Sequence, residues 1–240
     1  MTVSRETLDA ICQFDTCTVA NAIETFGVRL RNEGYTQPGL HAVTGGFPRA
    51  IGFAATCRIH TDGPPIGGAV YPETTDWWGA IDALPLPRIA VIQAEHIHFE
   101  QTNSHRGPEG DVSSSAVGEV HAAILRAFGC AAAITNGSVR DLQAVTAMNF
   151  PLFAAGVALS HGYTHLVDYG HPVEIFGLKI RSGDLIYADC HGALSIPPAI
   201  AERIPEAATR IRVHERRIVD ACESPDFTPE LLLKAIRSHA

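Results

Sequence analysis

The spacing of apolar residues along the chain predicts alternating strands and helices. Four short, continuous apolar runs are typical of buried strands, and they cover residues 51–59, 88–93, 130–135 and 151–155. The segment before the third run has apolar residues at helical spacing, and these are Val117, Val120, Ile124, Ala127 and Phe128. A second, short helix is expected over residues 141–148. Strands that alternate with helices in this way predict a layered α/β fold.

Both ends of the chain are predicted to be helical. Helical patterns cover residues 4–12 and 16–26 at one end, and residues 198–223 and a last helix opened by Pro229 at the other. Short strands are expected over residues 173–176, 178–180 and 184–188. We therefore expect residues 1–240 to form a single domain in which about residues 198–240 are a helical extension, packed on the domain or on a neighbour.

Composition and charge exclude several classes of function. Apolar residues make up 46% of the chain and charged residues 18%, so a sizeable core is expected. The net charge is −8 and no run of lysine and arginine appears, which argues against a nucleic-acid partner. The first thirty residues contain charged side chains and no long apolar run, so neither a signal peptide nor a membrane partner is expected. The six cysteines form no Cys-x-x-Cys pair, which fits free thiols in the cytoplasm.

Arg140 and Asp141 are the first candidates for chemistry. They follow an Asn-Gly turn at the end of a predicted buried strand, where ligands bind in layered α/β folds. An arginine offers a fork for a carboxylate or an enolate, and an aspartate offers a hard oxygen ligand for Mg²⁺ or Mn²⁺. The alternative is a structural pair in which Asp141 caps the helix over residues 142–148.

Gly118, Glu119, Val120 and His121 form the second candidate segment. They lie in the first turns of the predicted helix, where free backbone amides hold a carboxylate and a glycine permits close approach. The alternative is a glycine in an ordinary amphipathic helix. Since 140 − 118 = 22 positions separate the two candidates, a helix, a turn and a strand can return the chain so that both segments meet.

Three blocks of the chain, in order, resemble the RraA-like family. The first is the opening helix over residues 15–23. The second runs from Gly118 through Gly129 to Asp141 and continues over residues 150–156, and the third covers residues 183–193. The resemblance covers roughly residues 8–220. The family includes class II 4-hydroxy-4-methyl-2-oxoglutarate aldolases, related oxaloacetate decarboxylases and regulators of ribonuclease activity.

The resemblance implies a fold, an assembly and a site. It implies a layered β/β/α swivelling-type domain that assembles as a homotrimer or a homohexamer. Gly118 to His121 would supply backbone amides to the carboxylate of a small 2-oxo acid. Arg140 would contact the 2-oxo group, and Asp141 would ligate Mg²⁺ or Mn²⁺ largely through water. The implied activity is that of a metal-dependent lyase that yields a pyruvate enolate by aldol cleavage or by oxaloacetate-type decarboxylation.

Three departures from the family pattern bear on the reaction. Ala144 stands where the aldolases carry an acid, Asn136 stands where the family has Asp, and Asn21 stands where Asp is common. Aldol cleavage needs a base for the proton of the departing alkoxide, whereas decarboxylation does not. His121 and His161 are the candidates for that base. The alternatives are a non-catalytic oligomeric regulator that binds a protein such as a ribonuclease, and a lyase or hydratase acting on a sugar-acid derivative.

The other polar side chains carry weaker signals. His96 and His98, followed by Glu100, resemble part of a cupin metal motif, but the cupin glycines are absent. A further group of ambiguous side chains comprises Glu95, His105, Asp111, His161, His165 and His171. The histidines after Gly156 are more typical of loops near a subunit contact, although one of them could reach the pocket. The loop over about residues 100–112 is expected to cover the site.

Overall fold

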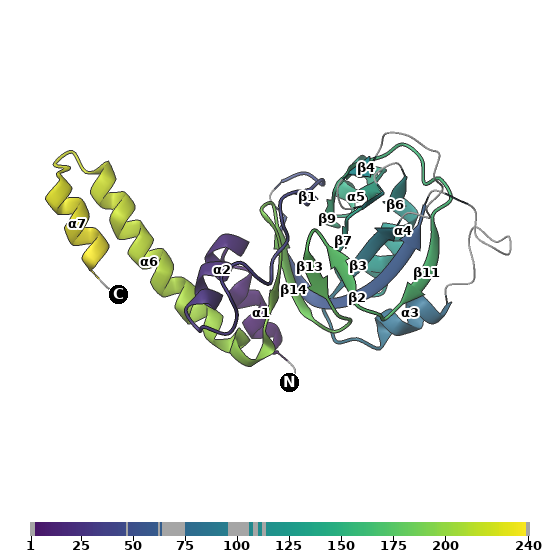
Figure 1. The fold of residues 1–240 in the computed structure, drawn as a ribbon, viewed down its shortest axis with the longest axis horizontal. Helices are drawn as coiled ribbons and strands as arrows, with labels where there is room; N and C mark the ends of the chain where they lie inside the picture. Colours follow the sequence, from purple (N-terminus) through teal and green to yellow (C-terminus); the bar gives the residue numbers. More distant parts are fainter. Residues whose placement is uncertain are drawn as a thin grey trace. The chain divides into compact units, whose positions relative to one another are not determined.

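The computed structural model describes residues 3–46, 48–61, 63, 75–95, 106–107, 110–111 and 114–238. The described residues form two compact units, and each is considered by itself. One comprises residues 32–196. The other comprises residues 3–31 together with the described residues from 197 onward (Figure 1). None of the helices in the described segments has the length and apolar character that crossing a membrane requires.

The larger unit is built on one mixed sheet. Its strands run in the order β1 (His41–Ala42), β9 (Leu152–Ala154), β7 (Cys130–Thr135), β3 (Arg88–Glu95), β2 (Ala50–His60), β14 (Leu185–Asp189) and β15 (Gly192–Ile196), and β11 (His165–Tyr169) also pairs with β2. Strands β2, β3, β7 and β9 are parallel, and each of them lies at one of the four apolar runs that were predicted to be buried strands. Three smaller sheets accompany it: β6 (Ser115–Val117) with β8 (Ser138–Val139) and β10 (Gly156–Val157), β12 (Val173–Ile175) with β13 (Leu178–Ile180), and β4 (Arg106–Gly107) with β5 (Gly110–Asp111).

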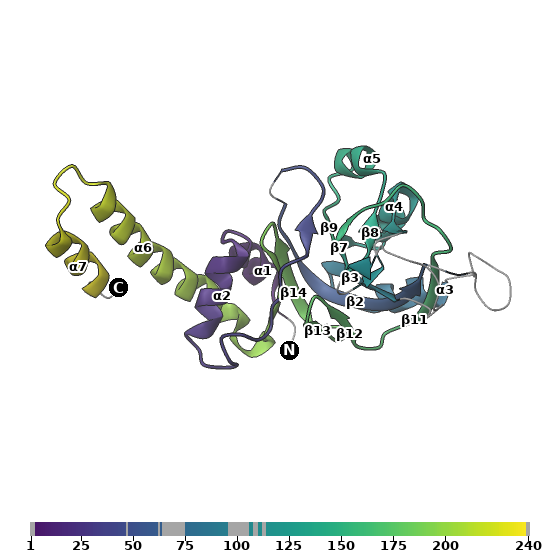
Figure 2. The same ribbon diagram turned by 45° about the horizontal axis from the view of Figure 1, so that its top comes forward.

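The two faces of the main sheet bury different partners. On one face, the hairpin of β12 and β13 packs on Ala54, Val91 and Ile134. On the other face, α3 (Thr75–Asp82) and α4 (Glu119–Ala127) pack on Ala55 and Ile92. Ala54 and Ala55 face opposite sides because successive side chains of a strand point to opposite faces of the sheet. The short helix α5 (Leu142–Ala147) follows β8 (Figure 2). The order hairpin, sheet, helix confirms the predicted β/β/α layering.

The helical unit contains both ends of the chain. Its helices are α1 (Arg5–Ile11), α2 (Thr16–Glu24), the 3-10 helix η1 (Pro198–Arg203), α6 (Ile204–Glu223) and α7 (Pro229–Arg237). Side chains cap three of them: Ser4 accepts from Thr7 N, Asp15 from Thr18 N and Thr228 from Leu231 N. The single helix predicted over residues 198–223 is therefore wrong over its first six residues. Pro205 at the start of α6 has no N–H for the helical ladder, which separates the two segments.

A second difference from prediction lies where the site forms. Val117 was predicted on the apolar face of a helix, but it belongs to β6, and the helix begins only at Glu119. The reason is tertiary: β6 pairs with β8, and Val117 O accepts from Arg140 N at 2.9 Å. Val120 also leaves the predicted buried face, because it is 74% exposed.

A buried arginine, Arg88, donates hydrogen bonds to the C-terminal ends of two helices. Arg88 is 7% exposed, and its guanidinium donates to Asp82 O at 2.5 Å, Leu84 O at 2.8 Å and Phe128 O at 2.6 Å. Asp82 ends α3 and Phe128 is the C-cap of α4. Arg88 therefore satisfies carbonyls that a helix end leaves without an internal partner.

We expect Arg88→Met to lower the free energy of unfolding by about 2–4 kcal/mol, because the variant keeps the apolar stem and removes every donor to those carbonyls. Urea unfolding followed by circular dichroism measures this change. Arg181→Met, at an exposed position of the same unit, is the control. A loss at Arg88 no greater than that of the control would contradict the role assigned to the guanidinium.

Candidate functional site

Two chain segments far apart in sequence meet where β6 and β8 end. The strands are parallel, with Val117 opposite Val139. Each strand passes directly into a helix, β6 into α4 and β8 into α5. Because parallel strands end at the same edge of a sheet, Gly118 to His121 lie beside Arg140 and Asp141. The structure thus brings together the two segments that the 22-residue spacing indicated.

Asp141 directs its carboxylate to the first amide of α4. Its Oδ2 atom accepts from Glu119 N at 3.0 Å and lies 3.4 Å from Arg140 Nε. Asp141 occupies the N-cap position of α5, but its side chain makes no capping hydrogen bond to that helix. The structural alternative, in which Asp141 caps residues 142–148, is therefore wrong. A left-handed backbone at Asp141, with φ 58°, sets this different orientation.

Position 118 needs a glycine because a larger side chain has no space there, and not because of the backbone conformation. Its φ is −123°, which any residue adopts. A Cβ atom at this position would lie 2.5 Å from Asp141 Oδ2 and 3.0 Å from Arg140 Nε. The missing side chain therefore allows the carboxylate and the guanidinium to lie against the start of α4.

All six predicted site residues line one cavity of about 480 Å³. Its polar end contains Gly118, Glu119, Arg140 and Asp141, with Val120 and His121 beside them. Arg140 and Asp141 have side chains that are 34% and 39% exposed, so solvent and small ligands reach both. Part of the cavity wall is apolar and is formed by Ile59, Trp77, Trp78, Ile124 and Leu166.

His121 is held in an apolar setting at the junction of the polar and apolar parts. Its Nδ1 atom lies 3.2 Å from Ala116 O, and its ring meets Trp78 edge-on with the centroids 5.8 Å apart. A carbonyl oxygen only accepts, so this bond places the ring proton on Nδ1 and leaves Nε2 as a proton acceptor. Burial lowers the pKa of His121 below its ordinary value of 6.5, against the smaller opposing effect of the bond to Ala116.

The lowered pKa gives an expected pH dependence. Because the unfolded chain binds a proton at His121 more readily than the folded protein, stability falls as the pH falls from about 6.5 toward the folded-state pKa. We expect His121→Gln to remove this contribution, so that the wild type loses more unfolding free energy than the variant between about pH 7.5 and about pH 5. Urea unfolding at both pH values measures it, and equal losses would contradict a buried neutral imidazole.

Cys57 also lines the cavity, but it is chemically inert there. Burial, together with the negative charge of Asp168, raises the pKa of the Cys57 thiol far above neutral pH. A protonated thiol is neither a nucleophile nor a ligand for a soft metal. The acidic residues Glu119 and Asp141 and the Arg140 guanidinium therefore define the chemistry at the polar end.

The remaining candidates divide between the cavity and other places. His161 and His165 line the cavity. His171 contributes its backbone carbonyl, which accepts from Thr56 Oγ1 at 2.8 Å, and it is not among the lining residues. The predictions that concern His96, His98, Glu100 and His105, the side chain of Asp111 and most of the loop over residues 100–112 lie outside the described residues.

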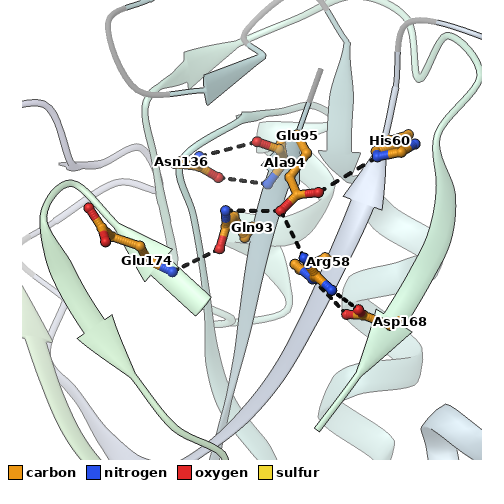
Figure 3. Close-up of polar contacts among 8 residues, drawn as sticks. All are labelled: Arg58, His60, Gln93, Ala94, Glu95, Asn136, Asp168 and Glu174. Atoms are coloured by element: carbon orange, nitrogen blue, oxygen red, sulfur yellow. Dashed lines mark hydrogen bonds and ion pairs between the residues drawn. The ribbon is translucent and has the colours of Figure 1, made fainter. Parts of the chain in front are cut away.

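A polar network occupies the opposite face of the sheet. Arg58 pairs with Asp168 and lies 3.4 Å from Glu95, which lies 3.6 Å from His60 (Figure 3). The hydrogen bond from Arg58 lowers the pKa of Asp168 below its usual range. Neighbouring residues of β2, such as Cys57 and Ile59, face the cavity. Glu95 belongs to this network and does not line the cavity, although the His60 ring of the network lies 5.7 Å from the ring of the cavity-lining His165.

Asn136 has a structural explanation on this sheet. Ala94 N donates to Asn136 Oδ1 at 2.7 Å, and Asn136 Nδ2 donates to Ala94 O at 3.2 Å (Figure 3). An aspartate would accept the first bond but could not donate the second. Asn136, which stands where the family has Asp, thus links the end of β7 to β3, and it does not line the cavity.

Asp189, Cys190 and His191 form a second cluster of potential metal-binding atoms, within 4.8 Å of one another. These residues lie at the turn between β14 and β15, where Asp189 pairs with Gly192. Asp189 Oδ1 accepts from His191 N at 2.8 Å and lies 3.1 Å from His191 Nδ1. Hydrogen bonding within a two-residue turn accounts for the cluster, and none of its members lines the cavity.

Sequence reasoning missed the two tryptophans of the cavity wall. Trp77 and Trp78 are the only tryptophans of the chain, and α3, which carries them, was not predicted. Two adjacent tryptophans in a chain with no others were the available signal. Their place in the cavity wall depends on tertiary packing, because α3 and α4 pack on the same face of the sheet.

Comparison with known proteins identifies relatives of both sequence and fold. The model of a family described as RraA-like, Aldolase/RraA, matches residues 16–194. A Halalkalibacterium halodurans protein named "Putative 4-hydroxy-4-methyl-2-oxoglutarate aldolase" is 29% identical over 103 residues, which are 42% of this chain and 49% of that protein. The chain spans less than two thirds of the length of the curated relatives it matches.

Two solved structures share the fold. An uncharacterized protein from Pseudomonas syringae pv. tomato has a TM-score of 0.70 at 22% identity, over 98% of this chain and 96% of that one. RraAS2 from Streptomyces coelicolor, described as an unusual member of the RNase ES inhibitor RraA protein family, has a TM-score of 0.66 at 19% identity, over 90% of this chain and 96% of that one. At these identities the likeness concerns the fold alone.

Proposed function

This chain belongs to the RraA-like family, and we propose that it is a divalent-metal-dependent lyase that releases pyruvate from a small 2-oxo acid. The observation that carries the proposal is the meeting of Arg140, Asp141 and the Glu119 amide at one end of the cavity. The family description, Aldolase/RraA, and one relative named as a 4-hydroxy-4-methyl-2-oxoglutarate aldolase support it at the level of the family. The reaction is aldol cleavage or oxaloacetate-type decarboxylation.

The residues at the polar end fit Mg²⁺ or Mn²⁺. These ions prefer carboxylate and water oxygens, and they bind through one or two carboxylates while keeping several waters. Asp141 would supply a carboxylate, Glu119 is a second acidic residue that lines the cavity, and the exposed fraction of Asp141 leaves room for water. Cys57, held as a thiol, offers nothing that would favour a softer metal. A bound divalent ion would act as a Lewis acid on the 2-oxo oxygen.

The residues of the chain have separate parts in the proposed reaction. The Arg140 guanidinium binds and orients the 2-oxo acid, and its charge stabilises the negative charge that develops as the bond β to the ketone breaks. In aldol cleavage the 4-hydroxyl proton moves to His121 Nε2, which is the free acceptor of a neutral imidazole. In decarboxylation no such transfer is needed. Ala144 lies in α5 and is not among the residues that line the cavity.

We expect Asp141→Asn to raise the Mn²⁺ concentration for half-maximal activity by about tenfold or more, because the variant removes the anionic ligand. Asparagine is the appropriate replacement, since it tolerates the left-handed backbone at this position. Mn²⁺ titration of pyruvate release, with thermal unfolding as a check of folding, measures the effect. An unchanged Mn²⁺ requirement would show that the metal binds elsewhere.

The experiment for the activity itself is an assay of pyruvate release. Pyruvate from oxaloacetate and from 4-hydroxy-2-oxo acids is followed with Mg²⁺ or Mn²⁺ and after EDTA. We expect release that needs the metal and returns when metal is added back. Release that is indifferent to EDTA would contradict the proposal.

The second candidate is an oligomeric regulator that binds a ribonuclease, and the alanine at position 144 favours it because the aldolase acid is missing. Co-purification with a ribonuclease assembly, without pyruvate release from any substrate, would support this alternative.

We also propose a homotrimer or homohexamer. Leu159 and Val120 support association because they are 96% and 74% exposed.

A further inference from the structure

We propose that the 2-oxo acid bound here carries an apolar substituent of aromatic size at its far end, in place of a second carboxylate. This inference rests on the proposed function, since it assumes that Arg140 and Asp141 hold the 2-oxo acid end. It concerns the opposite part of the same cavity. Its claim is the substrate class, a 4-hydroxy-2-oxo acid with a phenyl-like group on C4.

The first support is the apolar wall formed by Ile59, Trp77, Trp78, Ile124 and Leu166. Trp78 stacks on Phe128, with centroids 5.7 Å apart and planes 14° apart, and Trp77 lies 6.1 Å from the ring of Tyr169. These contacts fix both indoles before a ligand arrives. A rigid aromatic wall favours a flat, apolar ligand group, which it contacts without losing side-chain freedom.

The wall is continuous with the polar end of the cavity. Trp78 meets His121 edge-on, and His121 lies one helical turn from Gly118. A ligand whose carboxylate lies at the amides of α4 and whose 2-oxo group lies at Arg140 would therefore extend its C4 substituent toward the indoles. The volume of about 480 Å³ falls in the range of roughly 300–1,000 Å³ that is typical of drug-sized ligands, well above the needs of pyruvate.

The second support is the distribution of charge. Among the described residues that line the cavity, Arg140 is the one with a permanent positive charge, and it already lies beside Asp141. Glu119 and Asp141 are both acidic. A second substrate carboxylate beside the indoles would find no lysine and no further arginine among the described lining residues, and a desolvated charge without such a partner is costly. The charge pattern thus disfavours dicarboxylates and permits an apolar group.

The reaction balances without a further reactant. With 4-hydroxy-2-oxo-4-phenylbutanoate, the C3–C4 bond breaks and its electron pair passes to C3 and the 2-oxo group. The 4-hydroxyl proton moves to His121, and C4 leaves as benzaldehyde. The pyruvate enolate then takes a proton at C3 and leaves as pyruvate. No oxidation or reduction occurs.

The test compares three substrates that differ only at C4: phenyl, methyl and carboxylate. We expect kcat/KM for the phenyl compound to exceed that for each of the others by about tenfold or more, a factor typical of filling an apolar pocket. Trp78→Ala should lower the phenyl-to-methyl ratio by about tenfold, and the matched variant Trp78→Phe should largely keep it. Thermal unfolding checks that both variants fold.

Binding by the wild-type protein gives a second measurement that needs neither a variant nor turnover. 2-Oxo-4-phenylbutanoate should bind at least tenfold more tightly than 2-oxoglutarate in calorimetry with Mg²⁺ present, a difference that corresponds to about 1.4 kcal/mol. Both compounds lack the 4-hydroxyl that cleavage requires, and they differ only in the group on C4. Tighter binding of 2-oxoglutarate, or a phenyl-to-methyl ratio that Trp78→Ala leaves unaltered, would overturn the inference. A fall in oligomer mass on Trp78→Ala, without loss of phenyl preference, would overturn it too and assign the wall to an interface between copies.

The outcomes separate this inference from the proposed function. If methyl or carboxylate substrates release pyruvate and the phenyl substrate is the poorest, the lyase stands and the inference fails. If no substrate releases pyruvate, the proposed function fails, and the preference between 2-oxo-4-phenylbutanoate and 2-oxoglutarate in calorimetry still decides whether the wall selects apolar 2-oxo acids.

Discussion

Arg140→Ala is expected to lower kcat/KM for pyruvate release by about 10²–10³-fold, the usual loss when one group that stabilises a developing oxyanion is removed. The guanidinium is 34% exposed and lies in the cavity, where Asp141 is its one ion-pair partner among the described residues. The Arg140 side chain is partly exposed, in contrast to the buried Arg88. We therefore expect the loss of activity without a matching loss of stability.

The control for this prediction is Arg181→Ala, since Arg181 is exposed in the same unit and does not line the cavity. Arg140→Lys is informative as well. It keeps the charge but loses the planar fork, so we expect partial activity with a raised KM. Pyruvate release by Arg140→Ala at the rate of the Arg181→Ala control would remove Arg140 from the reaction.

Gly118→Ala is expected to lower kcat/KM by about 100-fold, because displacing reacting groups by roughly an ångström has effects of that size. The added Cβ would lie 2.5 Å from Asp141 Oδ2, so the carboxylate or the start of α4 must move. The backbone at Gly118 is extended, so the substitution introduces no conformational strain of its own. The expected change is therefore local to the site.

Gly79→Ala is the matched control, since an added Cβ there meets nothing within 4 Å. Gly79 lies inside α3, where alanine is the better helix former. We expect this variant to keep its activity and to be as stable as the wild type or more so. Full activity in Gly118→Ala, measured by the same assay, would contradict the close approach that the structure shows.

The layering of the fold was predictable because it rests on short-range patterns. Continuous apolar runs gave the parallel strands β2, β3 and β7, which are buried on both faces and so lack alternation. The start of α4 was predicted too early because it depends on a long-range strand pairing. Val117 fits a helical period, and only its pairing with a strand more than twenty residues away makes it part of β6.

The polar end of the site was predictable and the apolar wall was not. Arg140 and Asp141 follow a turn after a predicted strand, and Gly118 was placed at the start of a predicted helix, so that the 22-residue spacing indicated that the two segments meet. Trp77 and Trp78 reach the cavity through α3, which packs across the sheet from a different part of the chain. No local pattern records such a contact. The orientation of the Asp141 carboxylate also needed the structure, because the sequence was consistent with a helix cap.

The most direct test of the proposed site is a crystal structure of the full chain with Mn²⁺ and oxalate, a stable mimic of the pyruvate enolate. The anomalous signal of Mn²⁺ locates the metal without reference to any assumed chemistry. We expect Mn²⁺ beside Asp141, with oxalate between it, the Arg140 guanidinium and the amides at the start of α4. Mn²⁺ at Asp189, Cys190 and His191, or oxalate bound away from Arg140, would contradict the central claim.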